Sequence, residues 1–231
     1  MRILVVVATE EEVGSLKSEV GSKNQESRIK SQEFENETQD SGLKTFDYEV
    51  LITGVGMVAT AFALGKHLSS NTYDLVVNLG IAGSFDRSIA LGDVVEITED
   101  TFAELGAEDD LSFLPIAEMG FGEAMFYPSK KLADLYNLFN TFNLKQATAI
   151  TVNTVHGNEA SIKKVAERLK PQIESMEGAA FFYACKQFDV PCLQIRAVSN
   201  YVEKRNRDAW NIGLAIKNLN TFAAEFLKLY A

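Results

Sequence analysis

The sequence predicts an α/β fold in which a central, mostly parallel mixed sheet carries helices on both faces, a three-layer α/β/α sandwich. Three observations support this prediction. Short runs of Val, Ile and Leu recur along the chain, as expected of strands buried on both faces. Longer segments of helical character separate these runs, which is typical of a parallel sheet. Glycine-rich or polar residues follow several runs, at the edge where such sheets bind ligands.

The predicted elements follow one another along the whole chain. The predicted strands are residues 3–8, 48–52, 75–79, 92–97, 147–152 and 192–198. The predicted helices are residues 58–68, 129–139, 158–169, 176–188 and 208–229. Two stretches fit neither pattern: 21–43 is polar and is expected to be an exposed loop or excursion, and 99–126 is acidic and irregular. Because the 231 residues show neither a repeat nor a linker, we expect one domain covering 1–231.

Composition excludes several classes of protein. The formal net charge of −10 argues against nucleic acid or an anionic membrane surface as a partner. No apolar run is long enough to span a bilayer, and Met1 leads directly into a predicted strand, so neither a membrane segment nor a signal peptide is expected. Cys185 and Cys192 are expected to be core residues in a reducing compartment, which favours a cytoplasmic location.

A carboxylate marks the most informative stretch. Glu177 follows a short apolar segment and precedes Gly178-Ala179-Ala180, small residues that allow the next helix to pack closely. A preference for acidic residues at helix N-termini would explain Glu177 equally well. The last predicted strand ends in Ser199 and Asn200, two polar residues at the ligand-binding edge.

Three further turns carry possible ligand contacts. Glu12 lies three residues after Thr9, so it is either the acidic partner in a capping box or an acid at the ligand edge. Gly54-Val55-Gly56 can expose backbone N–H groups to an anion, but it lacks the remaining parts of a dinucleotide fingerprint. Residues 80–84, which begin with Gly80, are predicted to form a tight turn that permits close approach of a ligand.

The two histidines have no neighbours at metal-ligand spacing, and no metal site is predicted. His67 is interpreted as a surface residue or a residue at the C-terminal end of a helix. His156 lies in a loop between a strand and a helix.

These motifs, taken in order, resemble the purine nucleoside phosphorylase/nucleosidase superfamily. The resemblance rests on residues 7–13, 54–56, 78–83, 92–95, 175–179 and 196–200, and it covers nearly the whole chain. Within the superfamily the chain resembles the nucleosidases, and residues 199–212 resemble the futalosine hydrolase family of menaquinone biosynthesis more than the other nucleosidases. The resemblance implies a nucleoside phosphorylase-like fold, a small nucleoside substrate, no cofactor and a homo-oligomer.

The resemblance also implies roles for individual residues. Glu12 corresponds to the carboxylate that orients and deprotonates the attacking water, and Arg196 to the arginine near that water. Glu177 corresponds to the ribose-binding acid, and Met176 is expected to lie against the sugar. The remaining residues implied to bind substrate are Gly80, Ile81, Val155, His156 and Ser199.

Two positions depart from the adenine-specific nucleosidases. Asn200 replaces an aspartate, and an amide can donate to both N7 and O6 of a 6-oxopurine but cannot transfer a proton as an acid would. This favours hypoxanthine over adenine as the leaving group; capping of the following segment would also explain Asn200. Ile81 replaces a serine, which removes a hydroxyl from the expected water site.

The interpretation leaves alternatives. A methylthioadenosine/S-adenosylhomocysteine nucleosidase is the enzymatic alternative, a phosphorylase is less favoured because no arginine-bearing phosphate turn is visible, and a non-catalytic nucleoside-binding protein comes from another class. Futalosine carries a benzoate, and the basic cluster Lys204, Arg205 and Arg207 is a candidate to bind it. These residues could instead form a solvated face or pair with Glu203 and Asp208.

Overall fold

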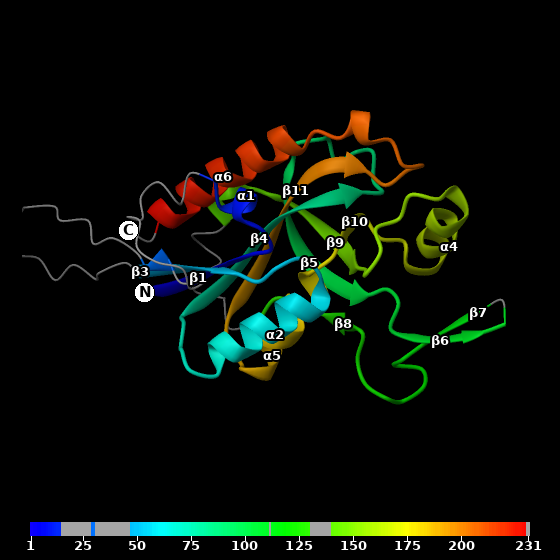
Figure 1. The fold of residues 1–231 in the computed structure, drawn as a ribbon, viewed down its shortest axis with the longest axis horizontal. Coiled ribbons are helices and arrows are strands. Elements are labelled where there is room, and N and C mark those ends of the chain that lie inside the picture. The colour runs from blue at the N-terminus through cyan, green and yellow to red at the C-terminus, as the bar shows by residue number, and fades with distance from the viewer. Residues whose placement is uncertain (15–28, 31–46, 111, 130–139, 230–231) are drawn as a thin grey trace, which may run out of the picture.

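A computed structural model describes residues 1–14, 29–30, 47–110, 112–129 and 140–229 (Figure 1). Its strands are β1 (Arg2–Val7), β2 (Ile29–Lys30), β3 (Asp47–Ile52), β4 (Leu75–Ser84), β5 (Val94–Phe102), β6 (Gly106–Asp109), β7 (Ser112–Pro115), β8 (Met125–Phe126), β9 (Lys145–Thr151), β10 (Ile173–Ser175) and β11 (Cys192–Tyr201). Its helices are α1 (Glu10–Val13), α2 (Met57–Leu68), α4 (Glu159–Leu169), α5 (Gly178–Gln187) and α6 (Ile212–Lys228), with 3₁₀ turns at Asn140–Phe142 and Arg207–Ala209.

The central sheet is mixed and runs in the order β10-β9-β5-β11-β4-β1-β3-β2. The pairs β1–β3, β1–β4, β4–β11, β5–β9 and β9–β10 are parallel. β10 also pairs with β4 in antiparallel fashion. The strands β4, β11, β5, β9 and β10 therefore close on one another, while β1, β3 and β2 extend from them as an open wing.

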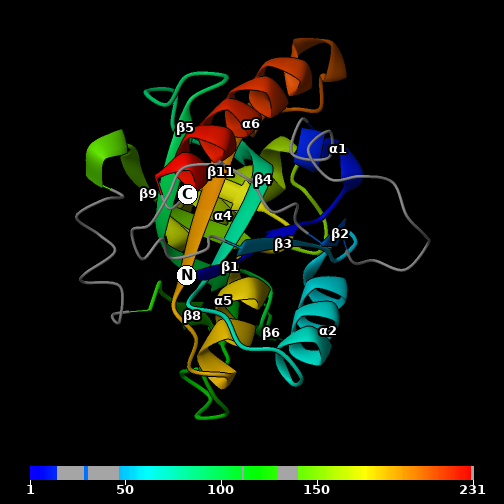
Figure 2. The ribbon, with the colours of Figure 1, turned by 90° about the vertical axis from the view of Figure 1, so that its left-hand side faces the viewer.

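Helices cover both faces of the sheet, as predicted (Figures 1 and 2). On one face, α2 and α5 contribute Leu64, Phe181 and Phe182 to a core shared with alternate residues of β4 and β11. On the other, α6 contributes Leu219 and Phe226 to a second core. Side chains along a strand alternate between faces, so the even-numbered residues of β4 before its end point toward α2 and α5.

Two predicted strands are longer than expected. β4 continues through Gly80 to Ser84, so the prediction of a tight turn at 80–84 is wrong. Its glycine-containing end remains extended because it still pairs with β11 on one side and β10 on the other. β11 likewise continues to Tyr201, so Asn200 lies within the strand, after a register shift between Val198 and Asn200.

The prediction that 99–126 is irregular is wrong in part. β5 extends to Phe102, β6 and β7 form a separate two-stranded sheet, and β8 pairs with β5. The sequence pattern failed at β5 because Asp100 is a charged residue type inside a strand, where its carboxylate is fully buried and hydrogen-bonded.

The other predictions divide by what the structure describes. The helix predicted at 129–139 lies almost wholly outside the described residues, as does 21–43 except for Ile29–Lys30, which form β2. Cys185 and Cys192 are free and buried, as expected. His67 belongs to the last turn of α2, but the surface interpretation is wrong, because it is buried and its Nε2 lies 2.6 Å from the Tyr73 hydroxyl. Within the described part of the chain, no helix has the length and apolar character needed to cross a membrane.

Candidate active site

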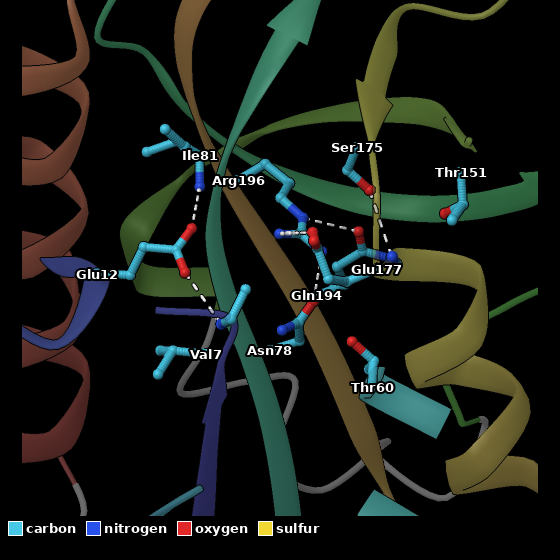
Figure 3. Close-up of polar contacts among 12 residues, drawn as sticks. Val7, Glu12, Thr60, Asn78, Ile81, Thr151, Ser175, Glu177, Gln194 and Arg196 are labelled. Atoms are coloured by element: carbon cyan, nitrogen blue, oxygen red, sulfur yellow. Dashed lines mark hydrogen bonds and ion pairs between the residues drawn. The ribbon is translucent and has the colours of Figure 1, made fainter. Parts of the chain in front are cut away.

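Glu12 is a buried carboxylate held by three backbone amides. Its Oε2 accepts from the N–H groups of Ala8 and Thr9, each at 3.0 Å. Its Oε1 accepts from the Ile81 N–H at 3.1 Å (Figure 3). The bond from Thr9 is the backbone half of the predicted capping box, yet the same carboxylate also reaches β4. Glu12 therefore takes part in the capping box and also accepts a hydrogen bond from β4.

Among the residues that the structure describes, Arg196 is the largest fully buried side chain, and it lies between two acids and two amides. Its Nε donates to Gln194 Oε1 at 3.0 Å, and its Nη2 donates to Asn78 Oδ1. Its Nη1 lies 3.6 Å from Glu177 Oε2. A Cβ at Gly80 would stand 2.0 Å from this Nη1 and 3.2 Å from Glu12 Oε1. Gly80 thus permits the close approach of two protein side chains, whereas the sequence led us to expect the approach of a ligand.

Glu177 is fixed from two sides. It precedes α5, and its Oε1 accepts from the Gly56 N–H at 3.0 Å. Gly56 has φ of 98° and precedes α2, so the carboxylate faces the positive end of that helix. The turn at Gly54-Val55-Gly56 therefore does bind an anion through its backbone, and the anion is Glu177.

Burial changes the acidity of Glu12. Desolvation raises the pKa of Glu12 above its ordinary value, although the Arg196 charge and the hydrogen bonds from Ile81 and Thr9 oppose the rise. A carboxylate with a raised pKa is a stronger base toward a water molecule near neutral pH. Oε1 accepts one of the three amide bonds, which leaves it an acceptor site for a water proton.

A second polar group lies further along β4 and β11. Asn200 is paired in register with Gly83, and a Cβ on Gly83 would stand 3.1 Å from Asn200 Nδ2. The Ser199 hydroxyl lies 2.9 Å from Asn200 Oδ1 and 3.2 Å from the Ala82 carbonyl oxygen. Asn200 Nδ2 donates to the Tyr201 carbonyl at 3.1 Å. Ser199 thereby orients the amide so that its N–H₂ group lies over the bare glycine.

His156 is held next to this group by an acid that the sequence did not single out. Its backbone N–H donates to Glu174 Oε1 at 2.9 Å, and its Nδ1 contacts Glu174 Oε2. Glu174 pairs with Gly83 from the β10 side, opposite Asn200 on β11. Burial raises the pKa of Glu174, while the bonds from His156 lower it. Glu174, Gly83 and Asn200 therefore form one row across three strands.

The other predicted residues lie around these two groups. Met176 is half-buried between β10 and Glu177, and Val155 is exposed on the loop that follows β9. Gly83 lies three positions after Gly80 on β4, a distance of about 10 Å along an extended strand. The site thus has a charged end at Glu12, Arg196 and Glu177 and an amide end at Asn200.

The basic cluster lies on the loop after β11. The Arg205 N–H donates to the Gly157 carbonyl at 3.1 Å, beside the loop of His156. The guanidinium of Arg205 lies 5.3 Å from the Trp210 ring centroid, and that of Arg207 lies 6.0 Å from it. Glu203 pairs with Arg87 rather than with a member of the cluster.

Several polar residues of the site were missed from the sequence. Asn78 and Gln194 are polar residues inside apolar strands, and this interruption could have marked them as residues of the site. Asp100 and Glu174 gave no such signal, because neither lay in a predicted strand.

Comparison with known proteins adds relatives to this geometry. Residues 2–230 match the model of the phosphorylase superfamily. A futalosine hydrolase of Streptomyces coelicolor is 36% identical over 178 residues, which are 74% of this chain and 75% of the relative. A futalosine hydrolase of Thermus thermophilus is 29% identical over 180 residues, 77% of this chain and 80% of the relative. The structure of a 5′-methylthioadenosine/S-adenosylhomocysteine nucleosidase from Campylobacter jejuni superimposes with a TM-score of 0.80 at 18% identity, covering 99% of this chain and 98% of that one.

Proposed function

The chain belongs to the phosphorylase superfamily, and from this premise we propose that it hydrolyses the N-glycosidic bond of futalosine. The products are hypoxanthine and dehypoxanthine futalosine. The observation that carries the proposal is the pairing of a buried Glu12–Arg196–Glu177 group with Asn200 at the other end of the same strand edge. Cleavage of a nucleoside needs both ends, because charge develops on the sugar and on the base together.

The charged end suits the sugar and the water. As the bond breaks, the ribose becomes cationic, and hydrogen bonds from its hydroxyls to the Glu177 carboxylate strengthen. Glu12 takes a proton from the attacking water through Oε1, as its raised pKa permits. The Arg196 guanidinium lies between the two carboxylates and opposes the rise in the pKa of Glu12 that burial and the Glu177 charge produce.

The amide end suits a 6-oxopurine. Asn200 Nδ2 donates one of its two hydrogens to the Tyr201 carbonyl, so only the second is left for the substrate, whereas the sequence suggested that both would be. That hydrogen can be donated to O6 of a 6-oxopurine, where the exocyclic amine of adenine would present another donor. A buried donor facing a donor loses its hydrogen bond, so the two bases are discriminated strongly. This is the reason for preferring futalosine over methylthioadenosine or S-adenosylhomocysteine as the substrate.

The deciding experiment is to incubate the protein separately with futalosine, methylthioadenosine and inosine and to identify the released base by chromatography. Release of hypoxanthine from futalosine, without added phosphate, is expected. Faster release of adenine from methylthioadenosine would favour the adenine nucleosidase instead. A phosphate requirement would indicate a phosphorylase, and binding without any base release would indicate a non-catalytic binding protein.

We also propose that the protein is a cytoplasmic homo-oligomer built from one domain. A row of exposed apolar side chains on α2 and the turn before it supports the assembly. Val58 is 77% exposed, Phe62 is 74% exposed and Val55, in the preceding turn, is 56% exposed. Aligned exposed apolar side chains of this kind are typical of a contact surface. Light scattering should give a mass larger than that of one chain, and Phe62→Glu should reduce it. A monomeric wild type would contradict the assembly.

A further inference from the structure

Asp100 is a fully buried acid that the proposed chemistry does not use. It lies on β5, and its two oxygens have different partners. The Thr151 hydroxyl lies 2.8 Å from Oδ1, and Gln194 Nε2 donates to Oδ2 at 3.1 Å. Burial raises its pKa to about 7, because removal from water disfavours the charged form of the carboxyl. A buried acid of this kind calls for an explanation beyond packing.

The hydrogen bonds around Asp100 have a fixed direction. The Ala179 N–H donates to Thr151 Oγ1 at 2.7 Å, so the hydroxyl hydrogen of Thr151 is directed to Asp100. When Asp100 is ionised, Gln194 must then turn its N–H₂ toward the remaining carboxylate oxygen, since a carboxylate only accepts. The amide oxygen of Gln194 therefore faces Arg196 Nε. Arginine has donors only, so the opposite orientation of Gln194 would place donor against donor.

The polar chain is enclosed on both sides by glycines. A Cβ on Gly178 would stand 2.1 Å from Asp100 Oδ2 and 2.2 Å from Gln194 Oε1. A Cβ on Gly80 would stand 2.0 Å from Arg196 Nη1. Neither position accepts a side chain without displacing the network, so its members have little room for another arrangement.

The other side of the guanidinium is held in the same way. Nη2 donates to Asn78 Oδ1, and Asn78 Nδ2 donates to the Val6 carbonyl at 2.9 Å. Two neutral amides thus fix two edges of the Arg196 plane. Nη1 is left to face Glu177 and the bare Gly80, beside Glu12.

We propose that Asp100 is a positioning residue for the hydrolytic site, acting through the amide of Gln194 to fix the plane of Arg196. Asp100 does not touch the substrate; it determines which end of Gln194 faces the arginine. The inference rests on the proposed function, because it concerns the same Arg196, and it adds two residues to the machinery that the reaction needs.

The test changes which of the residues at positions 100 and 194 donates the hydrogen bond between them. In the wild type, the two oxygens of Asp100 each accept one hydrogen bond, from Thr151 and from Gln194. Asp100→Asn leaves a single acceptor oxygen, so either Thr151 or Gln194 loses its partner. Gln194→Glu added to this variant restores every pair: the new asparagine donates to the new glutamate, whose other oxygen accepts from Arg196 Nε. Gln194→Met added instead fills the space but supplies no acceptor. The three proteins are compared with wild type for hypoxanthine release at saturating and limiting futalosine, and for thermal unfolding.

Asp100→Asn is expected to lower kcat by about tenfold or more, the range found when an outer partner that orients a functional group is lost. Asp100→Asn/Gln194→Glu should recover most of the activity, and Asp100→Asn/Gln194→Met should not. Glu96→Gln is the matched control, a buried acid on the same strand that accepts from Gln146 at 3.1 Å, and its kcat should stay near wild type.

Two results would overturn the inference. One is an Asp100→Asn enzyme within about twofold of wild type, since the range above starts at tenfold. The other concerns the variant Asp100→Asn/Gln194→Glu: it recovers the unfolding temperature of wild type but is no more active than Asp100→Asn/Gln194→Met. That result would leave Asp100 with a structural role only. Absence of base release from wild type would instead count against the proposed function, so the two failures are distinguishable.

Discussion

The Ile81 N–H donates to Glu12 Oε1 at 3.1 Å, joining the first helical turn of the chain to the middle of the sheet. The bond comes from the backbone, so it does not depend on the side chain at position 81. Ile81 lacks the hydroxyl expected from the adenine-specific nucleosidases, yet the carboxylate is still held. The departure at Ile81 therefore leaves the position of the proposed base intact.

Replacing Glu12 tests this arrangement. Glu12→Gln should retain substrate binding but lose hydrolysis by about 10²–10⁴-fold, because an amide cannot take the water proton. The amide also presents donors where Ala8, Thr9 and Ile81 each supply an N–H, so some loss of stability is expected. Steady-state kinetics of hypoxanthine release measures the effect, with Glu11→Gln, on an exposed neighbour, as control. A near wild-type kcat would leave Glu12 as a capping residue only.

Glu177 should matter more in the transition state than in substrate binding. Glu177→Ala removes the partner of the Gly56 N–H and of Arg196 Nη1 as well as the ribose contact, so kcat/KM should fall severely. Wild type should also cleave a 2′-deoxy nucleoside much more slowly than inosine. Equal rates for the two nucleosides would refute the ribose contact without any mutation.

Asn200 should decide which base is released. Asn200→Asp replaces the N–H₂ donor, so hypoxanthine release should fall and the ratio of adenine to hypoxanthine release should rise. Ser199→Ala removes the hydroxyl near Asn200 Oδ1 and should weaken the same preference to a smaller extent. Competition between methylthioadenosine and inosine measures the ratio. An unchanged ratio in Asn200→Asp would place the base elsewhere.

Asp100 predicts a pH dependence of stability. Its pKa rises from an ordinary 3.8 to about 7 in the folded protein, so between these values the folded state holds a proton that the unfolded state has lost. The contribution of Asp100 to the free energy of unfolding is therefore complete at low pH and is lost as the pH rises through about 7. Relative to Asp100→Asn, wild type should lose on the order of 2 kcal/mol between pH 5 and 8. Urea unfolding of both proteins at several pH values checks this; a constant difference would contradict it.

The basic loop after β11 is the candidate for the benzoate of futalosine. The Arg205 backbone N–H donates to the Gly157 carbonyl, and Gly157 is the residue next to His156 in the chain. Arg205 therefore lies nearer the candidate site than a residue whose only role is to face solvent would need to. Arg205→Ala and Arg207→Ala should raise KM for futalosine but leave KM for inosine unchanged. Equal effects on both substrates, or none, would direct attention to Arg87, Lys130, Lys131 or a neighbouring subunit.

The alternation of strands and helices, and the residues most suited to the chemistry, could be predicted from the sequence. Buried parallel strands are visible as apolar runs, and helix faces follow a fixed period, so these elements can be read locally. Glu12, Glu177, Arg196 and Asn200 stood out because polar residues at strand ends interrupt such patterns, and their roles came from a resemblance that the order of the motifs supports.

Which of these groups share partners depends on contacts between distant parts of the chain. The tight turn expected at 80–84 is part of β4, because β10 and β11 pair with that segment from both sides. The anion at the Gly56 amide is Glu177, 121 positions away in the chain. The sequence pattern placed Asp100 in an irregular stretch, yet it is buried in β5, because Gln194 and Thr151 supply donors from other strands. Burial of a charge depends on partners distant in sequence, and no local pattern records them.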